Sequence, residues 1–448
     1  MKENTENIVF TEEKAKRIGV LLVTLIKSSG DEEAAMSSIN ELRLLSETAL
    51  EGECENVECY ILTQIKASPE APTYIGSGKV QEAAKLCCDN GISLVVFDTE
   101  LSPSQIRNNE EIITAYDNKN ANVRVIDRTM LILDIFAKHA LTGEGKLQVE
   151  IAQLKYTAPR LTGKGVDLSR QAGTSGAVGA RGPGETKLET DRRHIKRRIE
   201  SLEAQLRDME SARNIKRSKR ENAGICNVAI VGYTNAGKST LLNYLTDAGI
   251  LAENKLFATL DPTTRKLSLP SGKEVLLTDT VGFINNLPTK LIQAFKSTLD
   301  EVRFADVLLL VADANDSEVE MKISVTQEII NDLDAGGKPQ ITVYNKCDGL
   351  DILPYAGNRE VLSGKNAVCI SAKTGAGIDD LLSLLEETVN HLSKKVKYLF
   401  PFDAQNAVNA LFRRATVLES EYTENGTLIT ALVDNELYGK YSEYAIEE

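Results

Sequence analysis

At 448 residues the chain is too long for a single hydrophobic core, so we expect two to four domains. Its composition (42% hydrophobic, 26% charged, net charge −13) is that of a globular protein, and no apolar run approaches the ~20 residues that span a bilayer. Seven cysteines without metal-ligand spacing and three scattered histidines argue against disulfide, metal-cluster and histidine-based chemistry.

Residues 1–128 alternate strand and helix patterns. Continuous apolar runs such as residues 17–26 are typical of strands buried on both faces, so the segment predicts a parallel α/β domain. It contains YIGSGK, from Tyr74 to Lys79. The two glycines suit either a second phosphate-binding loop or a tight turn into a helix, and the full phosphate-loop spacing is missing. The sequence leaves both interpretations open.

Residues 129–222 predict two helices joined by a long connection. Apolar side chains recur every three or four residues on otherwise charged helices, which indicates an antiparallel hairpin with a coiled-coil seam. The seam residues are Leu147, Ile151 and Leu154 in the first helix, and Ile195, Ile199, Leu202, Leu206 and Met209 in the second.

The connection, about residues 157–184, is basic and rich in glycine. Its basic residues are Arg160, Lys164, Arg170 and Arg181. From Lys155 to Arg220 there are 17 Lys and Arg against 8 Asp and Glu, a local charge of +9 in a chain whose remainder carries −22. Glycine permits close backbone approach and arginine pairs with phosphate, so a basic tip on a helical stalk suits RNA. The alternative is a solvated helix face with a flexible linker.

Residues 223–395 return to the α/β pattern, and residues 396–448 predict a small α+β domain with a hairpin that turns at Asn425-Gly426. Residues 232–239 read GYTNAGKS between a predicted strand and a predicted helix, which is the context of a phosphate-binding loop. We therefore expect a P-loop domain with a doubly wound, mostly parallel sheet.

In this loop the backbone N–H groups are expected to surround the phosphates of a nucleotide. Lys238 would place its charge on the β- and γ-phosphates, and the Ser239 hydroxyl would bind Mg²⁺. The predicted nucleotide contacts are Gly232, Tyr233, Thr234, Asn235, Ala236, Gly237, Lys238, Ser239 and Thr240.

Two later motifs complete the predicted site. DTVG ends a strand, and Asp279 can hold Mg²⁺ through its water shell while the Gly282 N–H reaches the γ-phosphate. Lys238, Asp279 and Gly282 are thus the candidate catalytic residues, with Thr280 and Val281 as further nucleotide contacts. NKCD follows at 345–348, where Asp348 can accept the ring N–H and exocyclic amino hydrogens of guanine.

Guanine recognition by Asp348 also requires residues that position its loop and a backbone N–H that binds the guanine O6. Asn345, Lys346 and Cys347 would position the base-reading loop, and Ser371, Ala372 and Lys373 would bring a backbone N–H near the guanine O6. Adenine cannot supply the hydrogens that Asp348 accepts, so GTP or GDP is expected and ATP is disfavoured.

The sequence offers several candidates for the residue that senses the γ-phosphate. The stretch FATLDPTTR offers Thr259, Thr263 and Thr264, and physical reasoning cannot choose among them. Phe283 follows DTVG where many switch GTPases place a glutamine that orients the attacking water. We expect hydrolysis to be slow until a partner completes the site.

GPGETKLETDRRHIKRRIESLE at residues 182–203, with GYTNAGKST, FATLDPTTR and DTVGF, resembles the HflX family of ribosome-associated GTPases. Residues 126–156 also resemble the segment that leads into its hairpin, although the glycine run before RGPGET is less dense here. The resemblance implies a Mg²⁺-dependent GTPase that binds the large ribosomal subunit and its RNA, and that splits or rescues ribosomes, notably under stress. It also implies Thr259 as a second Mg²⁺ ligand beside Ser239, nucleotide contacts from Phe257, Ala258, Leu260 and Asp261, and nucleotide binding by the first domain.

The expected protein is a cytoplasmic, ribosome-associated monomer without stable membrane insertion. Two alternatives share its nucleotide motifs: a GTPase of ribosome assembly or RNA modification, and a nucleotide-gated scaffold peripheral to a membrane. The second requires a basic amphipathic helix of broad apolar face, which the sequence does not offer.

Overall fold

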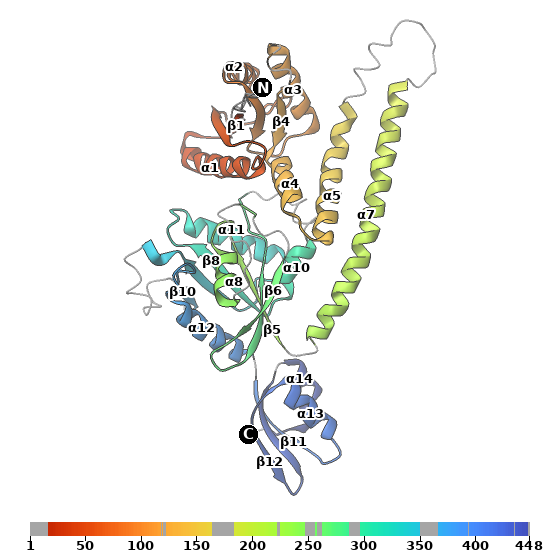
Figure 1. Ribbon diagram of the computed structural model, residues 1–448, viewed down its shortest axis with the longest axis vertical. Coiled ribbons are helices and arrows are strands. Elements are labelled where there is room, and N and C mark those ends of the chain that lie inside the picture. The colour runs from red at the N-terminus through yellow and green to blue at the C-terminus, as the bar shows by residue number, and fades with distance from the viewer. Residues whose placement is uncertain are drawn as a thin grey trace, which may run out of the picture. The chain divides into compact units, whose positions relative to one another are not determined.

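Figure 1 shows the computed structural model of the protein. The described residues are 17–117, 119, 122–163, 183–221, 225–246, 256–257, 262–285, 296–349, 366–392, 394–433 and 435–446. They form two compact units, one of Met1–Lys138 with Val149–Glu200 and one of His139–Gln148 with Ser201–Glu448. Within the described residues, no helix is both long and apolar enough to cross a membrane.

A four-stranded parallel sheet is the centre of the first unit. Its strand order is β2-β1-β3-β4. The strands are β1 (Arg17–Ile26), β2 (Asn56–Ile65), β3 (Ile92–Phe97) and β4 (Arg124–Asp127), and the helices are α1 (Glu32–Ala49), α2 (Ser77–Asn90), α3 (Pro103–Tyr116) and α4 (Arg128–His139). The apolar run of β1 is buried over its last seven residues, as a strand covered on both faces requires.

The YIGSGK segment forms the turn into α2. The Gly76 N–H donates to Gln64 Oε1 at 2.8 Å, and the Gly76 carbonyl accepts the N–H groups of Lys79 and Val80. Lys79 Nζ pairs with Glu82 on the same helix at 2.8 Å. This is the tight turn that the sequence allowed, and phosphate binding there stays a prediction.

Two helices form the predicted hairpin: α5 (Gly143–Thr157) and α7 (Pro183–Glu221). Glu150 of α5 pairs with Arg198 of α7 at 2.8 Å, and Glu144 pairs with Arg213 at 3.0 Å. The residue numbers of the paired side chains decrease along α5 while they increase along α7, so the two helices are antiparallel. Residues 164–182 of the predicted basic loop lie outside the described residues.

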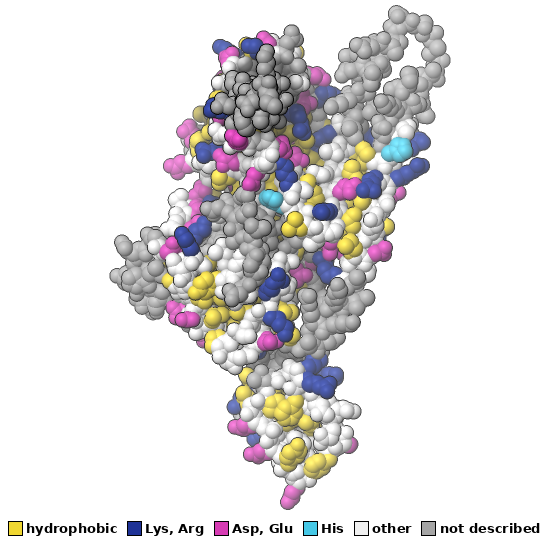
Figure 2. Space-filling view, viewed as in Figure 1, with side chains coloured by type: hydrophobic (Ala, Val, Ile, Leu, Met, Phe, Trp, Pro, Cys, Tyr) yellow, Lys and Arg dark blue, Asp and Glu magenta, His cyan; other side chains and the backbone are white. Residues whose placement is uncertain are grey.

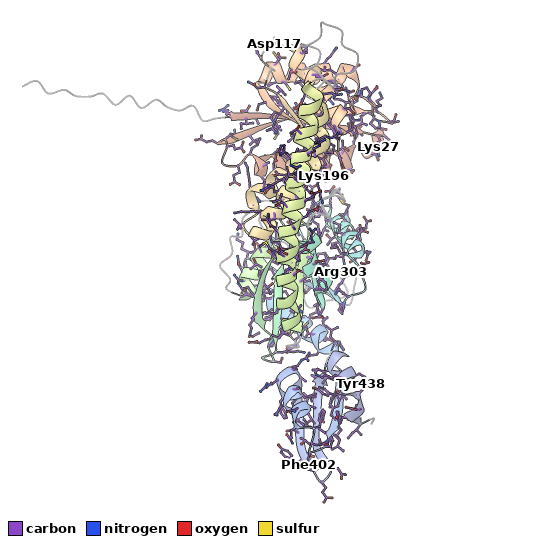
Figure 3. All side chains as sticks on the ribbon, turned by 90° about the vertical axis from the view of Figure 1, so that its right-hand side faces the viewer. Lys27, Asp117, Lys196, Arg303, Phe402 and Tyr438 are labelled. Carbon is purple, nitrogen blue, oxygen red and sulfur yellow. The ribbon has the colours of Figure 1, made fainter. Side chains whose placement is uncertain are left out.

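Basic side chains lie along the described part of α7 (Figure 2). Lys196, labelled in Figure 3, has a side chain 79% exposed.

The nucleotide-binding motifs lie on a six-stranded sheet of order β10-β9-β8-β5-β7-β6, in which only β6 runs antiparallel to its neighbour. Its strands are β5 (Cys226–Gly232), β6 (Thr263–Ser268), β7 (Glu274–Asp279), β8 (Val307–Asp313), β9 (Gln340–Asn345) and β10 (Ala367–Cys369). The helices are α8 (Lys238–Thr246), α10 (Lys296–Phe304), α11 (Val319–Asp332) and α12 (Ile378–His391). Alternate side chains of β5 and β8 enter two separate apolar clusters, so the sheet is covered on both faces.

The last part of the chain is an antiparallel sheet of order β12-β13-β11-β14. It comprises β11 (Lys394–Phe400), α13 (Gln405–Arg414), β12 (Thr416–Thr423), β13 (Gly426–Val433), α14 (Asn435–Lys440) and β14 (Ala445–Ile446). Its core joins Tyr398, Phe400 and Ile429 of the sheet to Leu411 of α13 and Leu437 of α14. The predicted fold class, a multidomain α/β protein with a P-loop domain, is confirmed.

Candidate functional site

The predicted phosphate-binding loop joins the end of β5 to the first turn of α8. Three of its residues have positive φ: Gly232 (150°), Asn235 (60°) and Gly237 (93°). The Phe283 carbonyl accepts the Thr234 N–H at 2.8 Å, and the Phe283 N–H donates to the Gly232 carbonyl at 3.1 Å. The chain after DTVG therefore pairs with the loop and holds the two motifs in register.

Gly237 allows the base-reading motif to approach this loop. A Cβ there would overlap Asn345 Nδ2, in a backbone conformation that L side chains rarely adopt. Gly237→Ala is expected to lower the free energy of unfolding by roughly 1–3 kcal/mol and to weaken nucleotide binding strongly. Gly272→Ala is the matched control, because Gly272 has a similar φ of 86° with nothing within 4 Å of its Cβ position. Equal losses in urea unfolding for the two variants would show that the close approach is not limiting.

Lys238 is the first residue of α8 and is buried, with 6% of its surface exposed. Its Nζ donates to the Tyr233 carbonyl at 2.8 Å. Burial lowers the pKa of Lys238 from 10.5 to about 8, and the nearby Asp279 carboxylate partly opposes this shift. A Cβ at Gly282 would lie 3.0 Å from Lys238 Nζ and 2.7 Å from Thr234 Cγ2, so glycine in DTVG leaves room for the ammonium group.

The lowered pKa of Lys238 predicts a pH dependence of stability in the nucleotide-free protein. The unfolded chain keeps this proton up to about pH 10.4, whereas the folded protein releases it near pH 8. Unfolding therefore binds a proton between these values, and stability should rise with pH across that window, by about 1–3 kcal/mol in all. Urea unfolding at pH 7.5 and 9.5 checks this, and Lys238→Met should lack this component of the rise.

Ser239 and Asp279 come together at the carboxyl end of β7. Ser239 Oγ donates to Asp279 Oδ2 at 2.6 Å, and the Asp279 side chain is fully buried. A hydroxyl and a carboxylate are hard oxygen ligands of the kind Mg²⁺ prefers, so this pair fits the ion. Elsewhere in the described chain, no group of three or more His, Cys, Asp or Glu residues could hold a metal. When bound, Mg²⁺ would neutralise charge between the β- and γ-phosphates.

The base-reading loops are joined to the phosphate loop by one side chain. Asn345, 2% exposed, donates from Nδ2 to the Ala236 carbonyl at 2.9 Å and accepts the Ala372 N–H at Oδ1, also at 2.9 Å. Thus a single carboxamide ties together the phosphate loop, NKCD and SAK. Its position at the end of β9 follows from the sequence, but its two partners do not.

Asp348 faces the same region from the turn after β9. Its Oδ1 accepts the Ser371 hydroxyl at 2.9 Å, which is the main cause of its lowered pKa. Asp348 is therefore ionised at neutral pH, as acceptance of two guanine hydrogens requires. The Cys347 side chain is buried, and its N–H donates to the Ile370 carbonyl at 3.1 Å, which fixes the loop against the end of β10.

Two contacts in this region were not predicted by any sequence motif. Lys346 Nζ pairs with Asp313 at 2.8 Å, and the Lys346 carbonyl accepts from Asn315 Nδ2 at 2.7 Å. The available signal was positional, because Asp313 ends β8 and carboxyl ends of adjacent parallel strands share one edge. Lys373 follows Ala372 at the surface.

The remaining predicted nucleotide contacts lie in β6, in α8, around DTVG and in the segment after Phe257. Thr280 Oγ1 donates to the Ile230 carbonyl at 2.6 Å, so it supports β5, and Val281 is buried. Thr263 and Thr264 begin β6, where Thr264 Oγ1 contacts Thr278 Oγ1 at 3.0 Å. Ala258, Thr259, Leu260 and Asp261 lie outside the described residues, and Thr240 lies in the first turn of α8.

Family models match three successive regions of the chain. Residues 36–137 match a GTP-binding GTPase N-terminal model, residues 139–220 a GTP-binding GTPase middle-region model, and residues 227–346 a 50S ribosome-binding GTPase model.

Curated relatives cover nearly the whole chain. The protein GTPase HflX of Caldanaerobacter subterraneus subsp. tengcongensis is 46% identical over 427 residues, which are 95% of this chain and 93% of the relative. GTPase HflX of Escherichia coli is 41% identical over 365 residues, 81% of this chain and 83% of the relative. A solved GTP-binding protein of Sulfolobus solfataricus in complex with GDP is 25% identical with a TM-score of 0.42, covering 83% of this chain and 99% of that one.

Proposed function

The chain belongs to the GTPase HflX family and hydrolyses GTP, and on that premise we propose that it acts on ribosomes through the large subunit. Binding and hydrolysis of GTP, with Mg²⁺ held by Ser239 and Thr259, would be coupled to splitting or rescue of ribosomes, under stress in particular. Switch segments held by the γ-phosphate and released on hydrolysis would provide the coupling.

The observation that carries this proposal is the strongly basic hairpin on the same chain as a guanine-nucleotide site. Residues 155–220 carry a net +9 in a chain of −13, which supports contact with the phosphate backbone of RNA. The 50S ribosome-binding model matched by residues 227–346 supports the choice of the large subunit.

The site also supports dependence on a partner. Phe283 is 1% exposed and packs in the core with Val231, Leu299 and Val302, so its side chain cannot orient a water at the γ-phosphate. The ribosome would then complete the site by positioning either the water or a residue of this chain.

Cosedimentation with ribosomes and separated subunits tests the proposal, in GDP, GTP and a non-hydrolysable GTP analogue across a salt series. We expect binding to mature large subunits that prefers the GTP forms and weakens steeply with salt. Preference for immature particles would favour the assembly alternative. Binding indifferent to both nucleotide and salt would refute a ribosome switch.

A further inference from the structure

The base of the hairpin contacts the nucleotide-binding domain at two described points within one compact unit. His139 Nδ1 lies 2.8 Å from the Phe257 carbonyl oxygen. Arg213 pairs with Glu144 at 3.0 Å and with Asp300 at 3.8 Å. We propose that His139 and Arg213 are positioning residues, whose contacts couple the conformation of the nucleotide site, with GDP or GTP bound, to the conformation of the hairpin. The ribosomal side of this inference rests on the proposed function, whereas its nucleotide side does not.

The first contact fixes an unusual backbone. Phe257 has φ of 58° although it is not glycine, and its side chain is 2% exposed. Such a conformation is disfavoured by about 1–2 kcal/mol for an L residue, so the surroundings must hold it. A carbonyl can only accept, which means that His139 Nδ1 carries the hydrogen and donates. Phe257 opens the FATLD stretch, so His139 anchors one end of the segment expected to sense the γ-phosphate.

The second contact reaches the other sensing motif through packed side chains. Phe283 follows Gly282 directly and lies in one apolar cluster with Leu299 and Val302 of α10. Asp300 is on the same helix and contacts Arg213. A displacement of DTVG by a γ-phosphate would therefore shift α10, because a close-packed core transmits strain instead of absorbing it.

The second route ends in the first turn of α5, and the first ends at His139, the last residue of α4, shortly before that turn. Thr142 Oγ1 accepts the Gly145 N–H at 3.0 Å, which caps the helix three residues after His139. Glu144, in the same turn, is the second partner of Arg213. The facing helix α7 is continuous from Pro183 to Glu221, about 58 Å of α-helix. A change at its Arg213 is thus carried along a stiff element.

The test compares the affinities of the isolated protein for fluorescent GDP and for a fluorescent non-hydrolysable GTP analogue. His139→Ala and Arg213→Ala should each change the ratio of the two dissociation constants at least threefold. Both changes should have the same sign, because the two contacts belong to one conformation and losing either disfavours it.

Two further variants separate positioning from general damage. His139→Asn places an amide N–H where the imidazole Nδ1–H stands, so it should restore the wild-type ratio, whereas His139→Gln should not. Arg198→Ala removes the Arg198–Glu150 pair between the same two helices, in the other compact unit, and should leave the ratio unchanged. Thermal unfolding confirms that each variant is folded.

Ribosome cosedimentation supplies the reciprocal measurement. Because coupling between two ligands is mutual, the preference of ribosome binding for the GTP analogue over GDP should also change in His139→Ala and Arg213→Ala and stay at the wild-type value in Arg198→Ala. Unchanged nucleotide ratios in folded His139→Ala and Arg213→Ala, or an equal change in Arg198→Ala, would overturn the inference. Absence of ribosome binding in the wild type would refute the proposed function and leave the nucleotide test intact.

Discussion

Replacing Lys238 with Met is expected to abolish measurable GTP hydrolysis and, at neutral pH, to stabilise the nucleotide-free protein. The two effects have one cause. The ammonium group is kept inside the loop, 6% exposed and beside Gly282, where the β- and γ-phosphates would lie. Burial without a phosphate lowers the pKa of Lys238 to about 8. The buried positive charge therefore destabilises the nucleotide-free protein, although nucleotide binding requires it.

The expected size of the loss follows from hydrogen bonds to charged groups. Such bonds contribute about 1.5–3 kcal/mol each, so loss of one corresponds to roughly 10–150-fold in affinity for GTP, and hydrolysis falls further if the transition state carries more charge. Nucleotide titration, single-turnover hydrolysis and urea unfolding are the measurements. Lys266→Met is the control, because Lys266 pairs with Glu274 at the surface with a side chain 64% exposed. Wild-type hydrolysis by Lys238→Met would refute the role of Lys238.

The proximity of the predicted nucleotide-site motifs could be expected from the sequence, because they are contiguous and lie at strand ends. A strand buried on both faces is recognisable from its apolar run, and the residues after parallel strands meet at one edge of the sheet. GYTNAGKS, DTVG and NKCD could therefore be assembled without a structure. The contacts of Asn345 could not, since Ala236 lies 109 residues earlier and is met through a backbone carbonyl that any residue offers.

In the hairpin, the sequence predicted which side chains can face the partner helix but not how deeply each is buried. The seam predicted for α7 includes Leu202, 1% exposed, but also Met209, 40% exposed. A spacing of three and four indicates which side chains can face a partner, but it does not give the size of the side chain opposite. Met209 faces the first residue of α5, where a Cβ at Gly143 would lie 3.5 Å from Met209 Cε, and a glycine covers little of the methionine. The His139–Phe257 bond was equally hidden, because it joins residues 118 positions apart through a backbone oxygen.

Asp348→Asn is expected to change the preferred nucleotide from GTP to XTP. The carboxylate can accept two guanine hydrogens, and its Oδ1 is already oriented by the Ser371 hydroxyl at 2.9 Å. With Asn, Oδ1 stays toward Ser371 and Nδ2 presents hydrogens to the guanine amino group, which leaves two donors facing each other. Xanthine carries an oxygen at that position and can accept. Loss of two bonds to a charged group predicts a decrease in GTP affinity on the order of 100-fold or more.

Competition of GTP, XTP and ATP against a fluorescent guanine nucleotide measures this change in the wild type, and a fluorescent xanthine nucleotide serves for the variant. Ser371→Ala is the matched control, because it removes the orienting hydroxyl but keeps the carboxylate. It should weaken GTP binding only a few-fold and should gain no affinity for XTP. If Asp348→Asn still preferred GTP over XTP as the wild type does, the base would be read by the Ser371–Lys373 backbone and not by Asp348. The ordering of the two variants therefore decides which side of the pocket confers guanine specificity.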